Sequence, residues 1–162
     1  MLRDENLVPL SRQHQHALAL CVRINRAPMA TAREVQAWQA EVEQHFGLEI
    51  QYHFAAEEKD VFPLARRIAS LVSLVEDLLA EHARLRDFFE KARTRKLDGP
   101  ALRVFADMLS THIRKEERQL FEEMQKHLSP AELGGMGGNV AQDLAPAADV
   151  CITPTEEILK RG

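Results

Sequence analysis

A ten-residue pattern of potential metal ligands occurs twice in this sequence. Residues 53–62 read HFAAEEKDVF and residues 112–121 read HIRKEERQLF; both contain His, Glu-Glu four residues later, then an aliphatic residue and Phe. On a helix, residues i and i+4 lie on one face about one turn apart. His53 with Glu57, and His112 with Glu116, therefore each direct an imidazole and a carboxylate to one point. Two such pairs facing each other offer the nitrogen and oxygen ligands that suit iron or another transition metal.

These pairs lie on the second and fourth of four predicted helices. The spacing of apolar residues predicts helices over residues 9–27, from 31 to one or two turns beyond Pro63, over 70–95 and over 100–128. Thr31 and Glu34 fit a capping box at the start of the second helix, and Asp98-Gly99-Pro100 separates the last two. No stretch has the alternating pattern of a strand. Long amphipathic helices with short connections predict an all-α, up-down-up-down four-helix bundle.

Each predicted helix has a histidine on its apolar stripe, and these four are His14, His53, His82 and His112. A single inward histidine is most often an ordinary core residue. Four of them, one per helix and two with Glu at i+4, are hard to attribute to packing. Burial of two carboxylates without cationic partners is costly, and the stripes contain no Lys or Arg. A metal cluster removes that cost, so the sequence predicts a metal site inside the bundle.

Two alternatives concern the first helix. His16 is an alternative to His14, but it lies about 200° around the helix from it, and His14 falls on the apolar stripe. For the other pairs of consecutive helices, the histidines are predicted to lie at similar heights along the bundle axis. In the first pair, His53 lies farther than His14 does from the turn that connects the two helices. His45 would match His14 better, and it starts a third HxxxE pair with Glu49. We prefer His53 because of its repeated context and expect a longer overhang between the first two helices.

The other acidic and histidine residues receive structural interpretations. Glu58 and Glu117 lie five residues after the histidine of each repeat and are predicted to form a solvated rim. Either could instead replace Glu57 or Glu116 as a metal ligand. His45 and Glu49 are interpreted as a structural pair, or as residues toward the other end of the bundle.

Composition excludes several classes of partner. The chain has 162 residues, the length of one domain, and a net charge of −4 gives no basic surface for nucleic acid. Charged residues interrupt each apolar run before it reaches the length of a membrane span. The first residues lack the apolar stretch of a secretory signal, and Cys21 and Cys151 form no CxxC motif. These features predict a cytoplasmic protein that does not bind nucleic acid or a membrane; they do not predict its oligomeric state.

The C-terminal part is expected to differ from the bundle. We assign residues 1–135 to the bundle and residues 136–162 to a tail containing Gly and Pro. Ser129 is expected to cap a short turn over residues 130–133. The GGMGG stretch at 134–138 then predicts a flexible connection to a last short helix over about residues 154–161.

At these histidine and glutamate positions the chain resembles the hemerythrin-like, or HHE cation-binding, family, over residues 7–128. The resemblance implies a four-helix bundle that holds two non-haem iron ions with an oxo or hydroxo bridge; zinc and manganese are possible substitutes. Transferred position by position, it implies four terminal imidazole ligands and two bridging carboxylates: His14, His53, His82 and His112, with Glu57 and Glu116.

The implied ligand set leaves coordination positions free. Four imidazoles, two bridging carboxylates and one oxygen bridge leave about two positions open on a pair of six-coordinate ions, as in reactive rather than purely structural sites. We therefore expect a protein that binds or senses a small oxidant (O₂, NO or peroxide) or handles iron. The alternative is a di-iron enzyme that reduces O₂, peroxide or NO, or a repair or stress-response iron protein. Because no catalytic residues or organic cofactor motif are apparent, a binding module is favoured over an enzyme.

One departure bears on oxygen carriage. The oxygen-carrying hemerythrins have a fifth histidine one turn from the ligand on the third helix. Here the positions four residues from His82 are Leu78 and Arg86. The sequence therefore disfavours reversible oxygen carriage.

Overall fold

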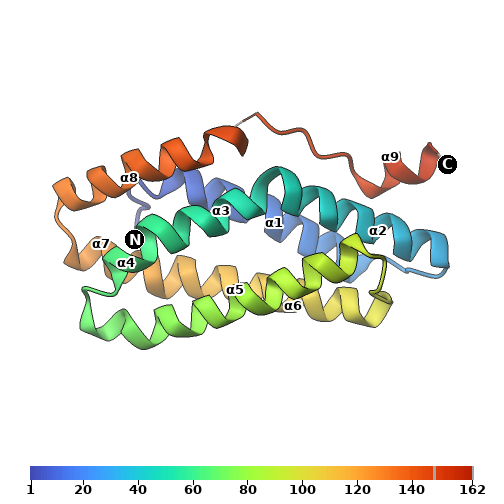
Figure 1. Ribbon diagram of the computed structural model, residues 1–162, viewed down its shortest axis with the longest axis horizontal. Helices are drawn as coiled ribbons and strands as arrows, with labels where there is room; N and C mark the ends of the chain where they lie inside the picture. Colours follow the sequence, from blue (N-terminus) through green and yellow to red (C-terminus); the bar gives the residue numbers. More distant parts are fainter. Residues whose placement is uncertain (148, 162) are drawn as a thin grey trace.

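The computed structural model describes residues 1–147 and 149–161, and these form four long helical segments with two further helices against them (Figure 1). Within the described residues no strand occurs, so the predicted all-α fold is confirmed. None of the described helices has an apolar stretch long enough to cross a membrane. The first segment is α1 (Val8–Arg26); the second runs through α2 (Ala32–His45), η1 (Phe46–Ile50), α3 (Gln51–Ala56), η2 (Glu57–Val61) and α4 (Phe62–Ala65); the third is η3 (Ala69–Leu71) with α5 (Val72–Arg93); the fourth is α6 (Gly99–Lys115), η4 (Glu116–Leu120) and α7 (Phe121–His127).

Two side-chain caps set where the second and fourth segments begin. The Glu34 N–H donates to Thr31 Oγ1 at 3.2 Å, and the Thr31 N–H donates to Glu34 Oε2 at 2.9 Å, which is the predicted capping box. The Ala101 N–H donates to the Asp98 carboxylate at 2.8 Å at the start of α6. Both caps satisfy backbone donors that have no partner within the helix, so each helix starts at a defined residue.

The link between α1 and α2 accounts for the unequal heights seen in the sequence. His14 lies about three turns before the end of α1 at Arg26, whereas His53 lies about six turns into the second segment. Residues 27–31 connect the two helices, with extended backbone at Ala27 (ψ 137°) and Thr31 (ψ 155°). Met29, between them, has a positive φ of 48°, so the link turns and is not extended throughout. The five-residue link allows the second segment to begin beyond the end of α1, in line with the expected longer overhang.

Three π-helical turns interrupt the second and fourth segments, and two of them fall at the repeated motif. The turn η2 begins at Glu57 and η4 begins at Glu116, the same position in each repeat. A π turn holds an extra residue and redirects the side chains around it, and such turns are frequent at functional sites. Pro63 follows η2 in the first turn of α4, where its missing N–H is tolerated.

The buried apolar residues of the bundle form two separate clusters, one on each side of the four inward histidines. On α1, Leu10 belongs to one cluster and Ala17 to the other, with His14 between them in the sequence. On α5, Leu78 and Leu85 flank His82 in the same way. The four histidines therefore lie in a polar layer across the middle of an apolar bundle, and each cluster excludes water from one side of it.

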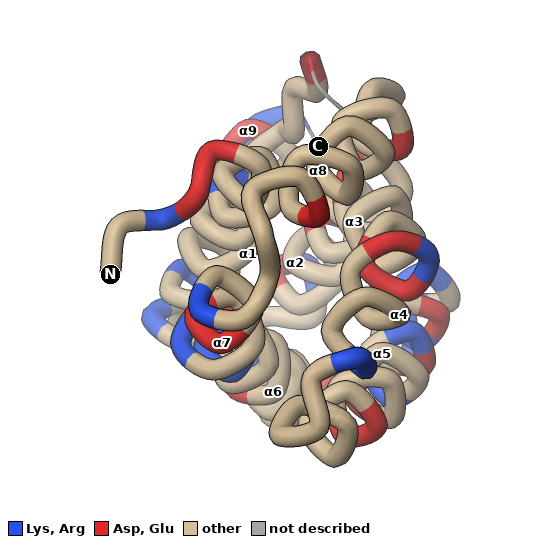
Figure 2. The backbone as a smooth tube through the Cα atoms, turned by 90° about the vertical axis from the view of Figure 1, so that its left-hand side faces the viewer, with Lys and Arg blue, Asp and Glu red and all other residues tan. Residues whose placement is uncertain are grey.

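The prediction of a short turn and a flexible connection after Ser129 is wrong. Residues Pro130–Leu144 form one helix, α8, which continues into η5 (Ala145–Ala147) and packs on α3. Figures 1 and 2 both show α8 outside the four-segment bundle, over α1 and α3. The boundary placed between residues 135 and 136 falls within this helix. The last predicted helix is present as α9 (Thr155–Lys160), which packs on α2.

Tertiary packing overrides the low helix propensity of the glycines in α8. Each glycine costs about 1 kcal/mol relative to Ala in a helix interior. A capping box between Ser129 and Glu132 starts the helix, and four apolar residues on one face are buried: Leu133, Met136, Val140 and Leu144. Burial of each contributes about 1.5–3 kcal/mol, which exceeds the glycine cost. A Cβ at Gly137 would lie 2.4 Å from Asn6 Oδ1, so the N-terminal residues can approach α8 only at a glycine.

Candidate metal centre

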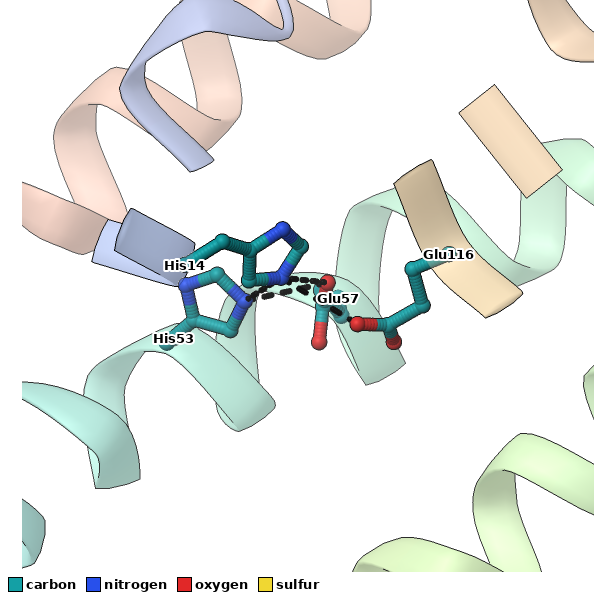
Figure 3. Close-up of side chains that lie close together, drawn as sticks. All are labelled: His14, His53, Glu57 and Glu116. Carbon is teal, nitrogen blue, oxygen red and sulfur yellow. Dashed lines mark hydrogen bonds and ion pairs between the residues drawn. The ribbon is translucent and has the colours of Figure 1, made fainter. Parts of the chain in front are cut away.

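The structure brings all six predicted ligand residues together in the polar layer. Each is at most 4% exposed. Their ligand atoms form two groups of four, within each of which all atoms lie within 4.8 Å of one another. Figure 3 shows the first group at close range. We call the first group site 1 and the second site 2, and they share both glutamates: His14, His53, Glu57 and Glu116 form site 1, and Glu57, His82, His112 and Glu116 form site 2.

The two oxygens of Glu57 face different sites. Oε1 lies 3.1 Å from His53 Nε2, which belongs to site 1. Oε2 lies 3.4 Å from His82 Nε2, which belongs to site 2. A carboxylate in this position can donate one oxygen to each of two neighbouring ions.

Glu116 is placed in the same way from the opposite side of the layer. Its Oε2 lies 3.1 Å from His14 Nε2, and its Oε1 lies 3.1 Å from His112 Nε2. Each site is therefore faced by one oxygen from each of the two glutamates and by two imidazole nitrogens. Because the arrangement repeats across the layer, the two sites are related by an approximate twofold symmetry.

The distance between the two imidazole nitrogens in each site suits a shared metal ion. His14 Nε2 and His53 Nε2 are 2.9 Å apart, and His82 Nε2 and His112 Nε2 are 3.1 Å apart. Metal–imidazole bonds are about 2.1 Å long, so two nitrogens bound to one ion at a right angle are about 3.0 Å apart. The spacing in both sites agrees with that value.

The glutamate at the second position of each Glu-Glu pair contacts a histidine of an adjacent segment. Glu58 Oε1 accepts from His82 Nδ1 at 2.8 Å, and Glu117 Oε1 accepts from His14 Nδ1 at 2.7 Å. These two glutamates were predicted to form a solvated rim; each is partly exposed and in addition accepts a hydrogen bond from a site histidine. Their side chains remain 31% and 24% exposed, so they lie at the edge of the layer.

Gln13 and Glu81 provide the other two contacts to outer imidazole nitrogens, and sequence patterns did not single them out. Gln13 Oε1 accepts from His53 Nδ1 at 2.8 Å, and Glu81 Oε2 accepts from His112 Nδ1 at 2.9 Å. Both precede a site histidine in the sequence, and that position was the only available signal. Since these oxygens only accept hydrogen bonds, each Nδ1 carries a proton, which leaves Nε2 as the nitrogen that can bind a metal ion once its own proton is lost, as in metal-bound histidines.

The phenylalanine that ends each repeat also packs on the histidine of a neighbouring segment. The Phe121 ring stacks on the His14 ring with centroids 5.7 Å apart, and the Phe62 ring lies 5.4 Å from that of His82. Phe54 also stacks on His82, with ring centroids 3.8 Å apart. Each repeat therefore supplies two candidate ligands and two contacts that orient a third, which explains why the whole ten-residue pattern occurs twice.

The buried carboxylates in the layer favour positive charge between the imidazole rings. Burial lowers the pKa of His14, but the carboxylates of Glu116 and Glu117 outweigh it and raise the pKa to about 9. Burial likewise lowers the pKa of His112, but Glu116 and Glu81 raise it to about 10. Although burial raises the pKa of Glu116, His112 and His14 hold it well below its usual value. Two buried carboxylates thus attract cations, which metal ions at sites 1 and 2 would supply.

The oxygens of the shared glutamates fit metal ligands better than hydrogen-bond acceptors. Among the residues that the structure describes, all four carboxylate oxygens of Glu57 and Glu116 are buried without a hydrogen bond of regular geometry. The imidazoles at 3.1–3.9 Å approach them but are not aligned to donate. Unpaired buried polar atoms are costly, and coordination of a cation removes that cost.

Residues 8–124 match the protein family described as hemerythrin HHE cation binding domain. The chain belongs to this family. No match was found among curated proteins or solved structures. Membership of the hemerythrin HHE family agrees with the helical bundle and with buried His/Glu groups that can hold metal ions.

Residues near the centre that were open in the sequence now have defined positions in this hemerythrin HHE domain. His14 lies in the buried layer, whereas the His16 side chain is 61% exposed and its Nδ1 contacts Glu49 Oε2 at 2.9 Å. Glu49 therefore bonds His16 rather than its predicted partner His45, which lies 3.6 Å from Glu41. The π turn η1 begins directly after His45 and contains Glu49.

The positions of the missing fifth histidine have other uses in this hemerythrin HHE domain. Leu78 is fully buried in the apolar cluster beside His82. Arg86 donates to Glu58 Oε1 at 2.7 Å and lies over the Phe54 ring, 5.4 Å from its centroid. Both residues support the surroundings of His82 and add no ligand.

Proposed function

We propose that this hemerythrin HHE domain holds two metal ions, one at site 1 and one at site 2. The four histidines are the terminal ligands and the two shared glutamates are bridges. The observation that supports this most strongly is the splitting of the Glu57 and Glu116 oxygens between the two sites. A structural role for buried carboxylates would pair both oxygens of each with donors, which is not the arrangement here.

We propose iron as the metal, with an oxo or hydroxo bridge between the two ions. Four neutral imidazoles and two carboxylates leave a modest positive charge on two ferrous ions, which an apolar bundle tolerates better than a larger charge. Such a ligand set also accepts zinc and manganese, so the metal that is available decides. Cys21 and Cys151 are free thiols, which fits a reducing cytoplasm where ferrous iron is present.

The ligand of the metal pair is proposed to be a small oxidant: O₂, NO or peroxide. Two iron ions with open positions supply coordination and electrons to such molecules. The chain itself supplies a cavity of about 10 Å³ beside His14 and His53, with an apolar wall that includes Ala17, Leu109 and Ile113. A cavity of this size holds about one water molecule, which limits the ligand to a few atoms.

Metal analysis tests this proposal most directly. Protein purified without added metal, then reconstituted with ferrous iron, is expected to contain about two iron ions per chain. After oxidation it should show the near-ultraviolet absorption of an oxo-bridged ferric pair. Less than half an ion per chain, or zinc retained in place of iron under reducing conditions, would contradict the assignment. Steady consumption of NO or peroxide by the reduced protein would indicate an enzyme rather than a binding or sensing module.

A further inference from the structure

A small cavity adjoins site 1 on one side of the histidine layer. His14, His53, His112 and Glu116 form its polar wall. Both histidines of site 1 line the cavity but only one histidine of site 2 does, so it lies closer to site 1 than to site 2. A molecule in this cavity would therefore meet the ion of site 1.

Glu49 is a buried acidic residue in the cavity wall that the proposed metal ligation does not use. The residue is 4% exposed and lines the cavity. Its Oε2 accepts from His16 Nδ1 at 2.9 Å, which holds the carboxylate in place. Its Oε1 is buried and, among the described residues, has no hydrogen-bond partner.

The local backbone places Glu49 at this position. It lies in the π turn η1, one helical turn before His53 on the same segment. π turns commonly redirect side chains at functional sites. An unpaired buried carboxylate oxygen costs free energy, and no hydrogen bond from the described residues offsets this for Oε1. Such an oxygen beside a cavity is available to a guest molecule.

We propose that Glu49 determines which small ligands occupy the cavity at site 1. Its free oxygen accepts a hydrogen bond from a ligand that carries an O–H group, such as water or hydrogen peroxide. Its negative charge opposes anions such as fluoride and azide. O₂ and NO have no hydrogen to donate, so Glu49 favours peroxide among the oxidants considered. This inference rests on the proposed function, because it requires a metal ion at site 1.

The test compares two substitutions in the iron-loaded, oxidised full chain. Glu49→Gln removes the charge but keeps a hydrogen-bond acceptor, whereas Glu49→Leu removes both. Glu43→Gln is the matched control, because it makes the same change in net charge on the same segment, at a side chain that is 40% exposed and paired with Arg95. Metal content and helix content are measured first for all four proteins.

Fluoride and azide binding, followed by the absorption of the metal centre, report the effect of charge. Both Glu49 variants are expected to bind these anions at least tenfold more tightly than the wild type and the control. Hydrogen peroxide reports the hydrogen bond. The concentration that gives the half-maximal spectral change should rise at least tenfold in Glu49→Leu and less than threefold in Glu49→Gln.

Each other outcome overturns the inference in a distinguishable way. Unchanged anion and peroxide binding in metal-loaded variants would show that Glu49 does not face the ligand, and the proposed function would stand. Loss of metal from Glu49→Gln would make Glu49 a metal ligand or a structural residue instead. If the wild type takes up no metal, the proposed function fails and this inference fails with it.

Discussion

The sharing of Glu57 and Glu116 between two sites predicts that single substitutions remove different numbers of metal ions. His53 belongs only to site 1 and His112 only to site 2, whereas Glu116 belongs to both. His53→Ala and His112→Ala should each reduce the metal content from about two ions per chain to about one. Glu116→Gln should remove most of both. His127→Ala is the control, because that side chain is 52% exposed and contacts Glu123.

The expected size of the effect follows from how many ligands each substitution takes away from a site. Removal of residues that only orient a ligand lowers metal affinity about 10–100-fold. Removal of a ligand itself should exceed that range, which corresponds to more than about 2.7 kcal/mol at the affected site. The histidine variants retain three of the four groups at one site and all four at the other. One weakened and one intact site give about one ion per chain under moderate competition.

The assay is elemental analysis after dialysis against a chelator whose concentration leaves the wild type fully loaded. Circular dichroism on the same samples checks that each variant keeps its helices. The reasoning would be refuted if Glu116→Gln retained as much metal as His112→Ala, since the glutamate would then serve one site only. Equal metal loss from His127→Ala and His112→Ala would refute the location of the centre.

Three further predictions concern the surroundings of the site and the tail. Glu58→Gln, which weakens the charged contact to His82 Nδ1, should lower metal affinity about 10–100-fold in a chelator competition, and an unchanged affinity would show that this contact does not tune the ligand. The metal-free protein should become less stable as the pH rises from 6.5 to about 10. In the folded state the pKa values of His14 and His112 are raised from 6.5 to about 9 and about 10, so in this range the folded state still binds protons that the unfolded state has released. Melting temperatures that rise with pH in this range would contradict the prediction. Gly137→Ala should destabilise the protein by about 1–3 kcal/mol, since the added Cβ would overlap the side chain of Asn6. In Gly134→Ala the added Cβ meets no atom within 4 Å, so this substitution should stabilise α8 by up to about 1 kcal/mol. Denaturant unfolding measures both free-energy changes, and equal effects would show that α8 does not pack as described.

Local features of the fold were predictable because they depend on residues close together in the sequence. The spacing of apolar residues placed the four helical segments, and the capping box at Thr31 and Glu34 is formed as expected. The His53–Glu57 and His112–Glu116 pairs rest on i to i+4 geometry, which is the same in every α-helix. The choice of His14 over His16 followed from its position on the apolar stripe, and the structure buries His14 and exposes His16.

Features that join different segments required the tertiary structure. Gln13 and Glu81 bond histidines 40 and 31 residues away in the sequence, and no local pattern links them. The second glutamate of each Glu-Glu pair, in the π turns that begin at Glu57 and Glu116, likewise contacts a histidine of another segment that the local spacing does not predict. The free oxygen of Glu49 beside the cavity likewise depends on η1 and on His16 of another helix.

The amino-acid sequence thus determined which residue types lie on the inner face of each helix, because that face follows from the period of the helix. Only the tertiary structure decided which of these residues meet, how the carboxylate oxygens divide between the two sites, and that four glycines lie within α8. The physical reason is the same in each case. Helix periodicity is a property of a short stretch of chain, whereas a contact between helices depends on their relative rotation and height, and these are set by the packing of the whole bundle.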